Sequence, residues 1–291
     1  TKSLRVSYDA SNSNIVRNYY KYENGEQLIN KELSIWNDFW NTGKPDHFMS
    51  SLKVNYELPL DKIPYLSFIK ASYSYTGDFD WRRGSDALTQ VANHQINTIQ
   101  NAQNHNFTAN MTFDKFYSSL GVKQRNKNTK AKLENYLLDI ITMVKRVGVT
   151  YTGNSGSVLP GYLPEVGFFG TSKPSLGYAM GFQDDIRYEA GRRGWLTNFP
   201  DFNDQFVQRN SKNFAFTANL QPTTDLQIDL KANREYVDSY NETFNAITGQ
   251  YNKLIGNQVG NFLISDNMIS TSFLRSDEYS SKAFQTFKNN R

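Results

Sequence analysis

Hydrophobic and polar residues alternate along much of this chain with a period of two residues rather than 3.6. Successive side chains of a β-strand point to opposite sides of a sheet, so each alternating stretch predicts a strand with one apolar and one polar row. About nine strands are expected on this basis. The alternation is clearest at 52–58, 69–75, 107–113, 214–220 and 226–232, and weaker at 4–8, 147–151, 176–182 and 269–273.

The two rows of the five clear strands differ in chemistry, because no charged residue occurs in the apolar rows. A Lys or Arg facing lipid at mid-bilayer costs about 2–4 kcal/mol in a transmembrane barrel, whereas one facing a wet lumen costs little. We therefore predict that the apolar rows face lipid and the polar rows face a lumen. The predicted lipid-facing residues are Leu52, Val54, Tyr56, Ile69, Ala71, Tyr73, Phe107, Ala109, Met111, Phe214, Phe216, Leu220, Leu226, Ile228 and Leu230. The predicted lumen-facing residues are Lys53, Asn55, Glu57, Lys70, Asn110, Asn219, Asp229 and Lys231.

Alternation alone also fits a soluble β-sandwich, which buries one face of each sheet. The composition favours a barrel wall, because hydrophobic residues make up only 38% of the chain. This percentage counts tyrosine but not glycine, whereas the reference value of roughly 45–50% for globular domains counts glycine but not tyrosine. Because the chain contains 18 Tyr and 18 Gly, the two percentages can be compared directly. A water-filled lumen needs no packed core. Disorder is a poor account, since aromatic residues reach 14%.

The connections between the predicted strands are unequal in length. Segments 59–64 and 221–225 are short, whereas 9–47, 77–104 and 238–263 are long and polar. Short turns on one side and long loops on the other are typical of outer-membrane barrels. We predict a hairpin turn at 221–225, long extracellular loops in the three long segments, and a loop and helix insertion at 114–142.

Aromatic residues gather near the ends of the predicted strands. Amphipathic rings prefer the boundary between membrane and water, so this placement also favours a barrel wall. The residues are Tyr8, Tyr56, Tyr65, Tyr73, Tyr75, Phe79, Trp81, Tyr151 and Tyr236.

The expected fold is therefore all-β, with residues 1–291 forming one wall segment of a larger antiparallel transmembrane β-barrel. Strand direction leaves one conflict. If 59–64 is a periplasmic turn, a strand at 176–182 would place the short turn at 221–225 on the outside. Either a further strand lies hidden in 188–211, with 194–197 as its candidate, or that segment enters the lumen.

No constellation of residues indicates catalysis. His47, His94 and His105 are expected to be exposed loop histidines. The glycine-rich segment 153–157 is expected to be a loop, since it lacks the Gly-Lys-Ser/Thr that binds phosphate. Asp184 and Asp185 are adjacent and would point apart on a strand. We predict no enzymatic activity, no metal site and no cofactor. The net charge of +4, without a dense basic stripe, argues against a nucleic-acid partner.

The chain contains no cysteine, which excludes disulfides and thiolate chemistry. No apolar run approaches the ~20 residues of a membrane-spanning helix. The chain starts at Thr1 rather than Met, and we expect it to be an excerpt of a longer polypeptide.

Several motifs resemble the SprA (Sov) family, the giant outer-membrane translocons of the type IX secretion system in Bacteroidota, which also serve gliding motility. The matching segments are 97–101, 159–164, 168–170, 174–187, 194–197 and 281–291. The resemblance implies a protein-conducting channel in the bacterial outer membrane that carries folded, secreted cargo proteins to the cell surface. It also implies two partners besides outer-membrane lipid, a PorV-type outer-membrane barrel and a periplasmic plug protein. The family motifs are structural, so no individual functional residue is carried over.

Two alternatives stay open. A TonB-dependent nutrient transporter shares the alternation, the aromatic belts and the unequal loops. A soluble all-β carbohydrate-binding domain would instead use exposed tryptophans such as Trp36 and Trp40.

Overall fold

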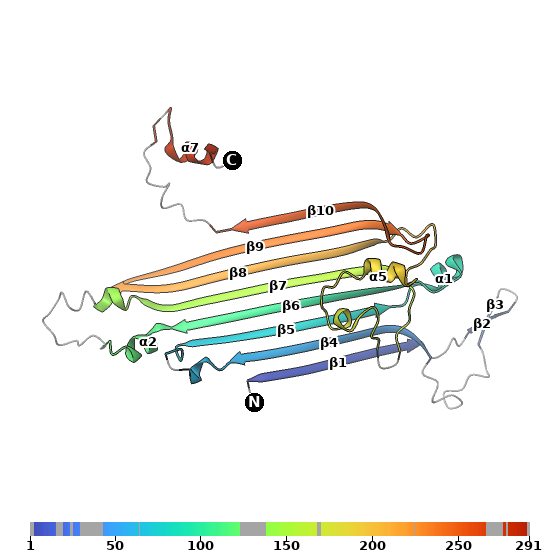
Figure 1. Cartoon of the computed structure of the whole chain (residues 1–291), viewed down its shortest axis with the longest axis horizontal. Coiled ribbons are helices and arrows are strands. Elements are labelled where there is room, and N and C mark those ends of the chain that lie inside the picture. The colour runs from blue at the N-terminus through green and yellow to red at the C-terminus, as the bar shows by residue number, and fades with distance from the viewer. Residues whose placement is uncertain are drawn as a thin grey trace.

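The chain forms a single long sheet of eight antiparallel strands in a computed structural model (Figure 1). The spatial order is β1-β4-β5-β6-β7-β8-β9-β10, and β2 and β3 form a separate hairpin. The structure describes residues 3–15, 20–23, 26–29, 43–63, 65–122, 138–167, 170–223, 225–265, 276–277 and 279–289. The strands are β1 (Leu4–Ile15), β2 (Tyr20–Glu23), β3 (Glu26–Ile29), β4 (Lys44–Leu58), β5 (Ile69–Arg82), β6 (Asn97–Thr112), β7 (Val144–Tyr162), β8 (Gln205–Thr223), β9 (Leu226–Asn245) and β10 (Asn252–Ile264). The helices are η1 (Leu60–Lys62), α1 (Asp86–Ala92), α2 (Phe113–Ser119), α4 (Leu176–Ala179), α5 (Arg187–Arg192) and α7 (Lys282–Asn289).

The all-β, antiparallel class expected from the alternation is confirmed. All five clear stretches lie in strands of the sheet except for Phe113, which begins α2, and the weaker stretches at 4–8 and 147–151 also lie in strands. The short hairpin is also confirmed, since β8 and β9 join where Thr223 pairs with Leu226. Within the described residues the sheet is open, with β1 and β10 as its two edges.

The strand expected at 176–182 is wrong, because residues 176–179 form helix α4. The Ser175 hydroxyl accepts a hydrogen bond from the Tyr178 amide at 3.0 Å and so caps the first turn. The apolar residues here alternate with Gly177, Ala179 and Gly181 rather than with polar residues, so the pattern carries no polar row. The expected strand at 269–273 lies outside the described residues.

The strands run further than the alternation predicted, and the expected loops are correspondingly shorter. Strand residues occupy 9–15, 44–47, 77–82, 97–104 and 238–245, and an additional strand, β10, fills most of the expected loop at 238–263. The glycine-rich segment 153–157 is the interior of β7 rather than a loop. Helix α1 ends at Ala92, and β6 begins at Asn97.

The two ends of the sheet differ in their connections. At one end, here called the turn end, β4 ends and β5 begins, β6 ends and β7 begins, and β8 ends and β9 begins. At the opposite end, here called the capped end, the same holds for β1 and β4, β5 and β6, β7 and β8, and β9 and β10. Because 176–182 is not a strand, both short turns fall at the same end, and the conflict in strand direction disappears.

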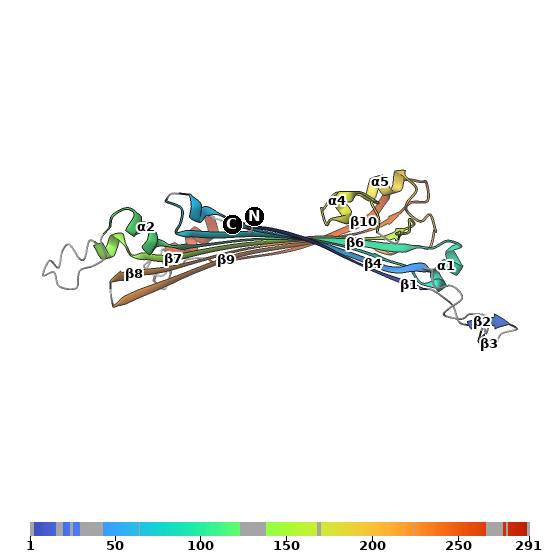
Figure 2. The ribbon, with the colours of Figure 1, turned by 90° about the horizontal axis from the view of Figure 1, so that it is seen from below.

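Residues 163–204, here called the cap, fold over one face of the sheet at the capped end (Figure 2). Sheet residues such as Phe79, Trp81 and Ile99 are fully buried against Tyr178 and Leu196 of the cap. The hidden strand considered in 188–211 is not present: Leu196 makes only an isolated bridge to Tyr162, and 205–211 begins β8. The cap lies over the face that carries the apolar rows. Phe79 and Trp81 lie an even number of residues from Ile69 and Tyr73 on β5, and so point to the same face of the sheet.

Two glycines allow the cap to approach the sheet closely. A Cβ on Gly77 of β5 would lie 1.9 Å from the Met180 carbonyl oxygen. Gly181 has φ of +92°, and a Cβ there would lie 2.5 Å from the Gly77 Cα. Since both contacts involve backbone atoms, no side-chain movement would relieve them. The cap and the sheet can meet here only through glycine.

We expect Gly77→Ala to lift the cap off the sheet. Overpacking against backbone costs about 1–3 kcal/mol, so amide hydrogen exchange in 176–196 should rise in the full-length protein while exchange in β6 and β7 stays slow. Gly153→Ala is the matched control, because its Cβ would meet only the movable Tyr151 ring, at 3.2 Å. Unchanged exchange in Gly77→Ala would contradict the close contact.

Candidate functional site

The register of the sheet gathers the apolar rows of separate strands onto one face. Directly opposite residues share a face, and Tyr73 stands opposite both Tyr56 and Phe107. Ala109 stands opposite Ala71 and Val149 in the same way. All fifteen residues predicted to face lipid share this face. We call the surface the apolar band and define it as Leu4, Val6, Tyr8, Leu52, Val54, Tyr56, Ile69, Ala71, Tyr73, Phe107, Ala109, Met111, Val147, Val149, Tyr151, Phe214, Phe216, Ala218, Leu220, Leu226, Ile228 and Leu230.

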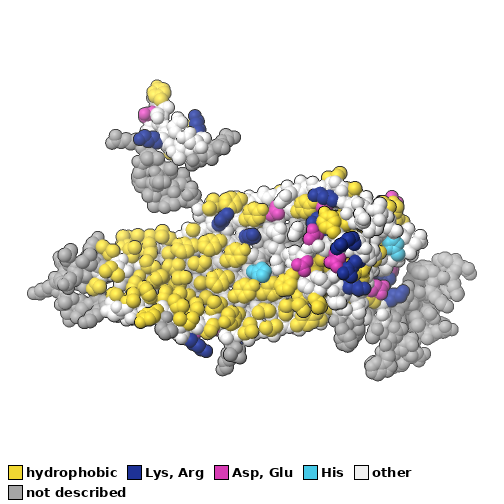
Figure 3. Space-filling model, in the orientation of Figure 1, with side chains coloured by type: hydrophobic (Ala, Val, Ile, Leu, Met, Phe, Trp, Pro, Cys, Tyr) yellow, Lys and Arg dark blue, Asp and Glu magenta, His cyan; other side chains and the backbone are white. Residues whose placement is uncertain are grey.

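The apolar band is exposed and large. Val6 is 61% exposed, Leu230 46% and Phe214 41%. The rows of the band span five to seven residues of each strand, which extend about 13–20 Å, and its seven strands, spaced by about 4.8 Å, extend about 29 Å. The surface is therefore roughly 400–600 Å², whereas soluble monomers rarely expose a continuous apolar patch larger than a few hundred Å². Figure 3 shows the band as a continuous hydrophobic surface that gives way to a mixed, charged surface over the cap.

The reverse face of the same strands is polar. Lys70 stands opposite Asn110, which stands opposite Gly148, and on the far side of β8 Thr217 stands opposite Lys231. The Asn219 amide donates to Asp229 at 2.6 Å across β8 and β9. All eight residues predicted to line a lumen lie on this face, which we call the polar face. The two sets of residues predicted from the sequence thus lie on opposite faces of the sheet, and the medium that each face meets stays a prediction.

Aromatic side chains mark both margins of the apolar band. At the turn end, Phe68, Phe113 and Phe116 form a ring cluster in which the Phe68 and Phe116 centroids lie 4.8 Å apart. Towards the cap, Tyr75 packs on Phe182 of the cap and donates to the Met180 carbonyl at 2.8 Å. Two of the aromatics expected at a boundary lie elsewhere. Phe79 and Trp81 are buried under the cap, where Trp81 Nε1 donates to the Pro164 carbonyl at 3.0 Å.

Of the three histidines expected in exposed loops, His94 lies in the connection between α1 and β6 and is half-buried, whereas His47 and His105 lie in strands. His47 on β4 has Nε2 2.6 Å from an Asp80 carboxylate oxygen. His105 on β6 has Nδ1 2.7 Å from the Tyr73 hydroxyl, and His94 has Nε2 2.7 Å from the Thr197 hydroxyl. Each histidine therefore has a separate partner. Among the described residues, no group of three or more His, Asp or Glu side chains is arranged to hold a metal ion.

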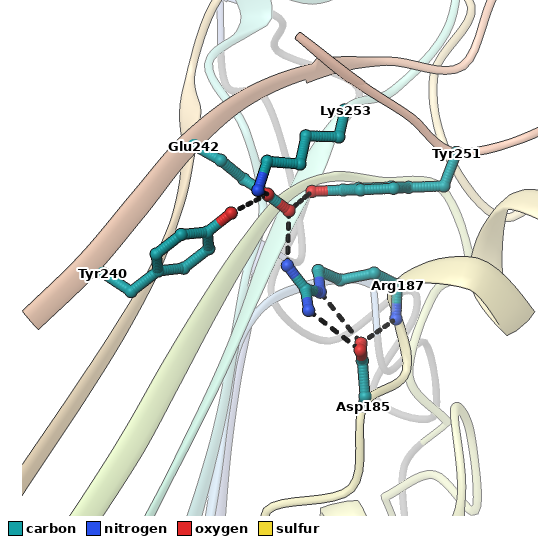
Figure 4. A network of polar contacts seen from close by, with 6 residues as sticks. All are labelled: Asp185, Arg187, Tyr240, Glu242, Tyr251 and Lys253. Carbon is teal, nitrogen blue, oxygen red and sulfur yellow. Dashed lines mark hydrogen bonds and ion pairs between the residues drawn. The ribbon is translucent and has the colours of Figure 1, made fainter. Parts of the chain in front are cut away.

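A buried ion-pair network joins the cap to β9 and β10 at the capped end, beyond the apolar band (Figure 4). The Glu242 side chain of β9 is fully buried and pairs with Arg187 of α5. The hydroxyls of Tyr240 and Tyr251 donate to the same carboxylate, and Lys253 Nζ lies 3.7 Å from it. Arg187 also donates to both oxygens of Asp185, at 2.8 Å each.

The network fixes the charges of its members. Burial acts to raise the pKa of Glu242, but hydrogen bonds from Tyr240, Tyr251 and Arg187 outweigh it, so the pKa of Glu242 is lowered from 4.5. The hydrogen bond from Arg187 likewise lowers the pKa of Asp185. Arg187 is held as a cation, since its pKa is raised by its hydrogen bond to Asp185. This network of charged residues is therefore suited to holding the cap in place against β9 and β10.

Sequence reasoning missed this network. Arg187 and Glu242 are 55 residues apart, and no local pattern links them. Asp185 was considered only as half of an acidic pair, whereas its structural partner is Arg187, two residues on. Three of the six segments that carry the family resemblance, 159–164, 174–187 and 194–197, lie in the cap or at its junction with β7, whereas 97–101 begins β6. Trp36 and Trp40, the candidates for sugar stacking, lie outside the described residues.

Comparison with models of known protein families and with curated proteins finds no match to the chain. Among the described residues, no helix is both long enough and apolar enough to cross a membrane.

We expect Glu242→Gln to loosen the cap by about 2–3 kcal/mol, because it leaves a buried guanidinium with one carboxylate instead of two. Amide exchange in 186–196 of the full-length protein should rise at neutral pH. Glu235→Gln, an exposed position on the polar face of the same strand, is the control and should change little.

The pH dependence follows from the lowered pKa of Glu242. Its stabilisation of the cap is fully present above about pH 4.5 and is lost as the pH falls through the lowered pKa. Exchange in 186–196 should therefore rise below pH 4.5 in the wild type and respond less in Glu242→Gln. Equal protection of the two proteins at every pH would show that the network does not hold the cap.

Proposed function

We propose that this chain is a wall segment of a large transmembrane β-barrel in a bacterial outer membrane. The apolar band faces lipid, and the polar face lines a water-filled lumen. The observation that carries the proposal is the division of one sheet into a continuous, exposed apolar surface and a polar reverse face, with no second layer over the apolar band in the described residues.

The open edges of the sheet support a larger barrel. Strands β1 and β10 each pair on one side only in the described chain, and unpaired backbone groups are not tolerated in the hydrocarbon region. Further strands of the same barrel would satisfy them. The placement of both short turns at one end supports assigning the turn end to the periplasm and the capped end to the cell surface.

The barrel we propose is the protein-conducting channel of the type IX secretion system. The resemblance of the cap motifs to the SprA family supports this choice. The polar face supports it as well, since neutral Asn, Ser and Thr residues at positions such as Asn106, Thr108 and Thr150 keep a lumen wet without binding passing cargo tightly. A PorV-type barrel and a periplasmic plug protein would close the openings of such a pore, and the energy for transport would come from other components.

A pair of arginine substitutions on β7 tests which face meets lipid. Val149→Arg places a charge at the centre of the apolar band and should destabilise the barrel by about 2–4 kcal/mol, which lowers the amount of folded full-length protein in the outer membrane. Thr150→Arg, one residue on and on the polar face, is the matched control and should assemble normally. The reverse result, or equal assembly of both variants, would contradict the proposal that the apolar band faces lipid.

A blocking experiment tests transport. A single cysteine introduced as Thr150→Cys should react in intact cells with a bulky water-soluble maleimide that enters the lumen, and labelling should reduce secretion of folded cargo. Val149→Cys should resist the same reagent and leave secretion unchanged. Normal secretion with a fully labelled lumen, together with loss of uptake of a small nutrient, would favour the TonB-dependent transporter instead.

A further inference from the structure

Two basic side chains interrupt the apolar face at the margin of the band nearest the cap. Lys212 on β8 stands opposite Tyr236, and Arg234 on β9 stands opposite Phe214. Both cations therefore share the face of the apolar band. They are diagonal neighbours across the β8–β9 pair, which places their backbones roughly 7–8 Å apart. Side chains as long as lysine and arginine on such neighbours can both reach one anionic group of the size of a phosphate, and both residues line one depression.

Among the described residues, neither cation has an acidic partner. Both side chains are exposed. Asp238, the acidic residue that follows on the same face of β9, accepts a hydrogen bond from Gln258 at 2.8 Å. By contrast, Arg187 and Lys253 on the capped side both pair with Glu242.

The two cations border a depression with an apolar floor. It has a volume of about 560 Å³ and is lined by Tyr151, Lys212, Phe214, Arg234 and Tyr236. The Arg234 guanidinium lies 5.3 Å from the centre of the Phe262 ring on β10, a contact that holds its planar head beside the depression. A small hydrophilic anion would use the two cations alone, whereas an amphiphile would also cover the rings of Phe214 and Tyr151.

We propose that Lys212 and Arg234 bind the phosphate-bearing headgroup of a membrane lipid, whose acyl chains lie along the apolar band. This inference rests on the proposed function, since it requires the band to face lipid. Arginine and lysine near a membrane surface attract anionic headgroups, and a phosphate between them accepts charge-assisted hydrogen bonds from both. On the proposed orientation the lipid belongs to the leaflet at the capped end.

Native mass spectrometry of the full-length protein in a neutral detergent tests the site. Lipid A, which carries phosphate groups on an acylated core, is titrated against the wild type and against the double variant Lys212→Gln/Arg234→Gln. We expect the double variant to bind at least roughly tenfold more weakly at one site. The control Lys70→Gln/Lys231→Gln removes two exposed cations from the polar face and should bind as the wild type does.

Three outcomes would overturn the proposal. Equal binding by the wild type and the Lys212/Arg234 double variant would show that the charged groups of the two residues point into water and do not bind the lipid. Equal loss in the polar-face control would show a general effect of charge. Competition by inorganic phosphate as strong as that by lipid A would show an adventitious ion only. Failure here stays distinct from failure of the proposed function, because every variant should still assemble in the membrane if the apolar band faces lipid.

Discussion

A sheet one layer thick has two faces, and each must meet a medium that suits its side chains. Most of the structure follows from that constraint. Val149 and Thr150 are neighbours in β7, yet one lies in a continuous apolar surface and the other in a polar one. Beyond the apolar band, the same face of the sheet is covered by the cap, which buries Phe79 and Trp81 against Tyr178 and Leu196. Apolar side chains at the capped end thus have a protein core, whereas those of the band have none among the described residues.

This difference explains how far the sequence could predict the fold. Alternation is strong where one face requires apolar residues and the other tolerates any polar ones, and there the strands and both their faces were predictable. Under the cap the requirement changes. Gly153 and Ser157 of β7 lie on the face of the apolar band but are small or polar. Ser157 donates a hydrogen bond to Asn101 at 2.9 Å rather than packing against apolar side chains. That half of β7 shows no period-two signal, so it resembled a loop.

The polar network at the capped end was beyond sequence reasoning for a different reason. Its members come from α5, β9, β10 and the residues just before α5 and β10, and only the folded topology brings Arg187 to Glu242. The local sequence does not reveal that the Glu242 carboxylate is buried, since Glu242 lies two residues after Tyr240 in a stretch like that of any other strand. The cation pair Lys212 and Arg234 was likewise invisible, because the register of β8 against β9 decides that the two share a face.

The glycine contact between Gly77 and Gly181 fixes on which side of the wall the cap stands. If the polar face lines a channel, the longest insertion at the cell-surface end leans away from the bore and occupies none of its cross-section. On that proposal, changes in the cap over evolution would remodel what the cell displays to its surroundings without narrowing the route through the barrel.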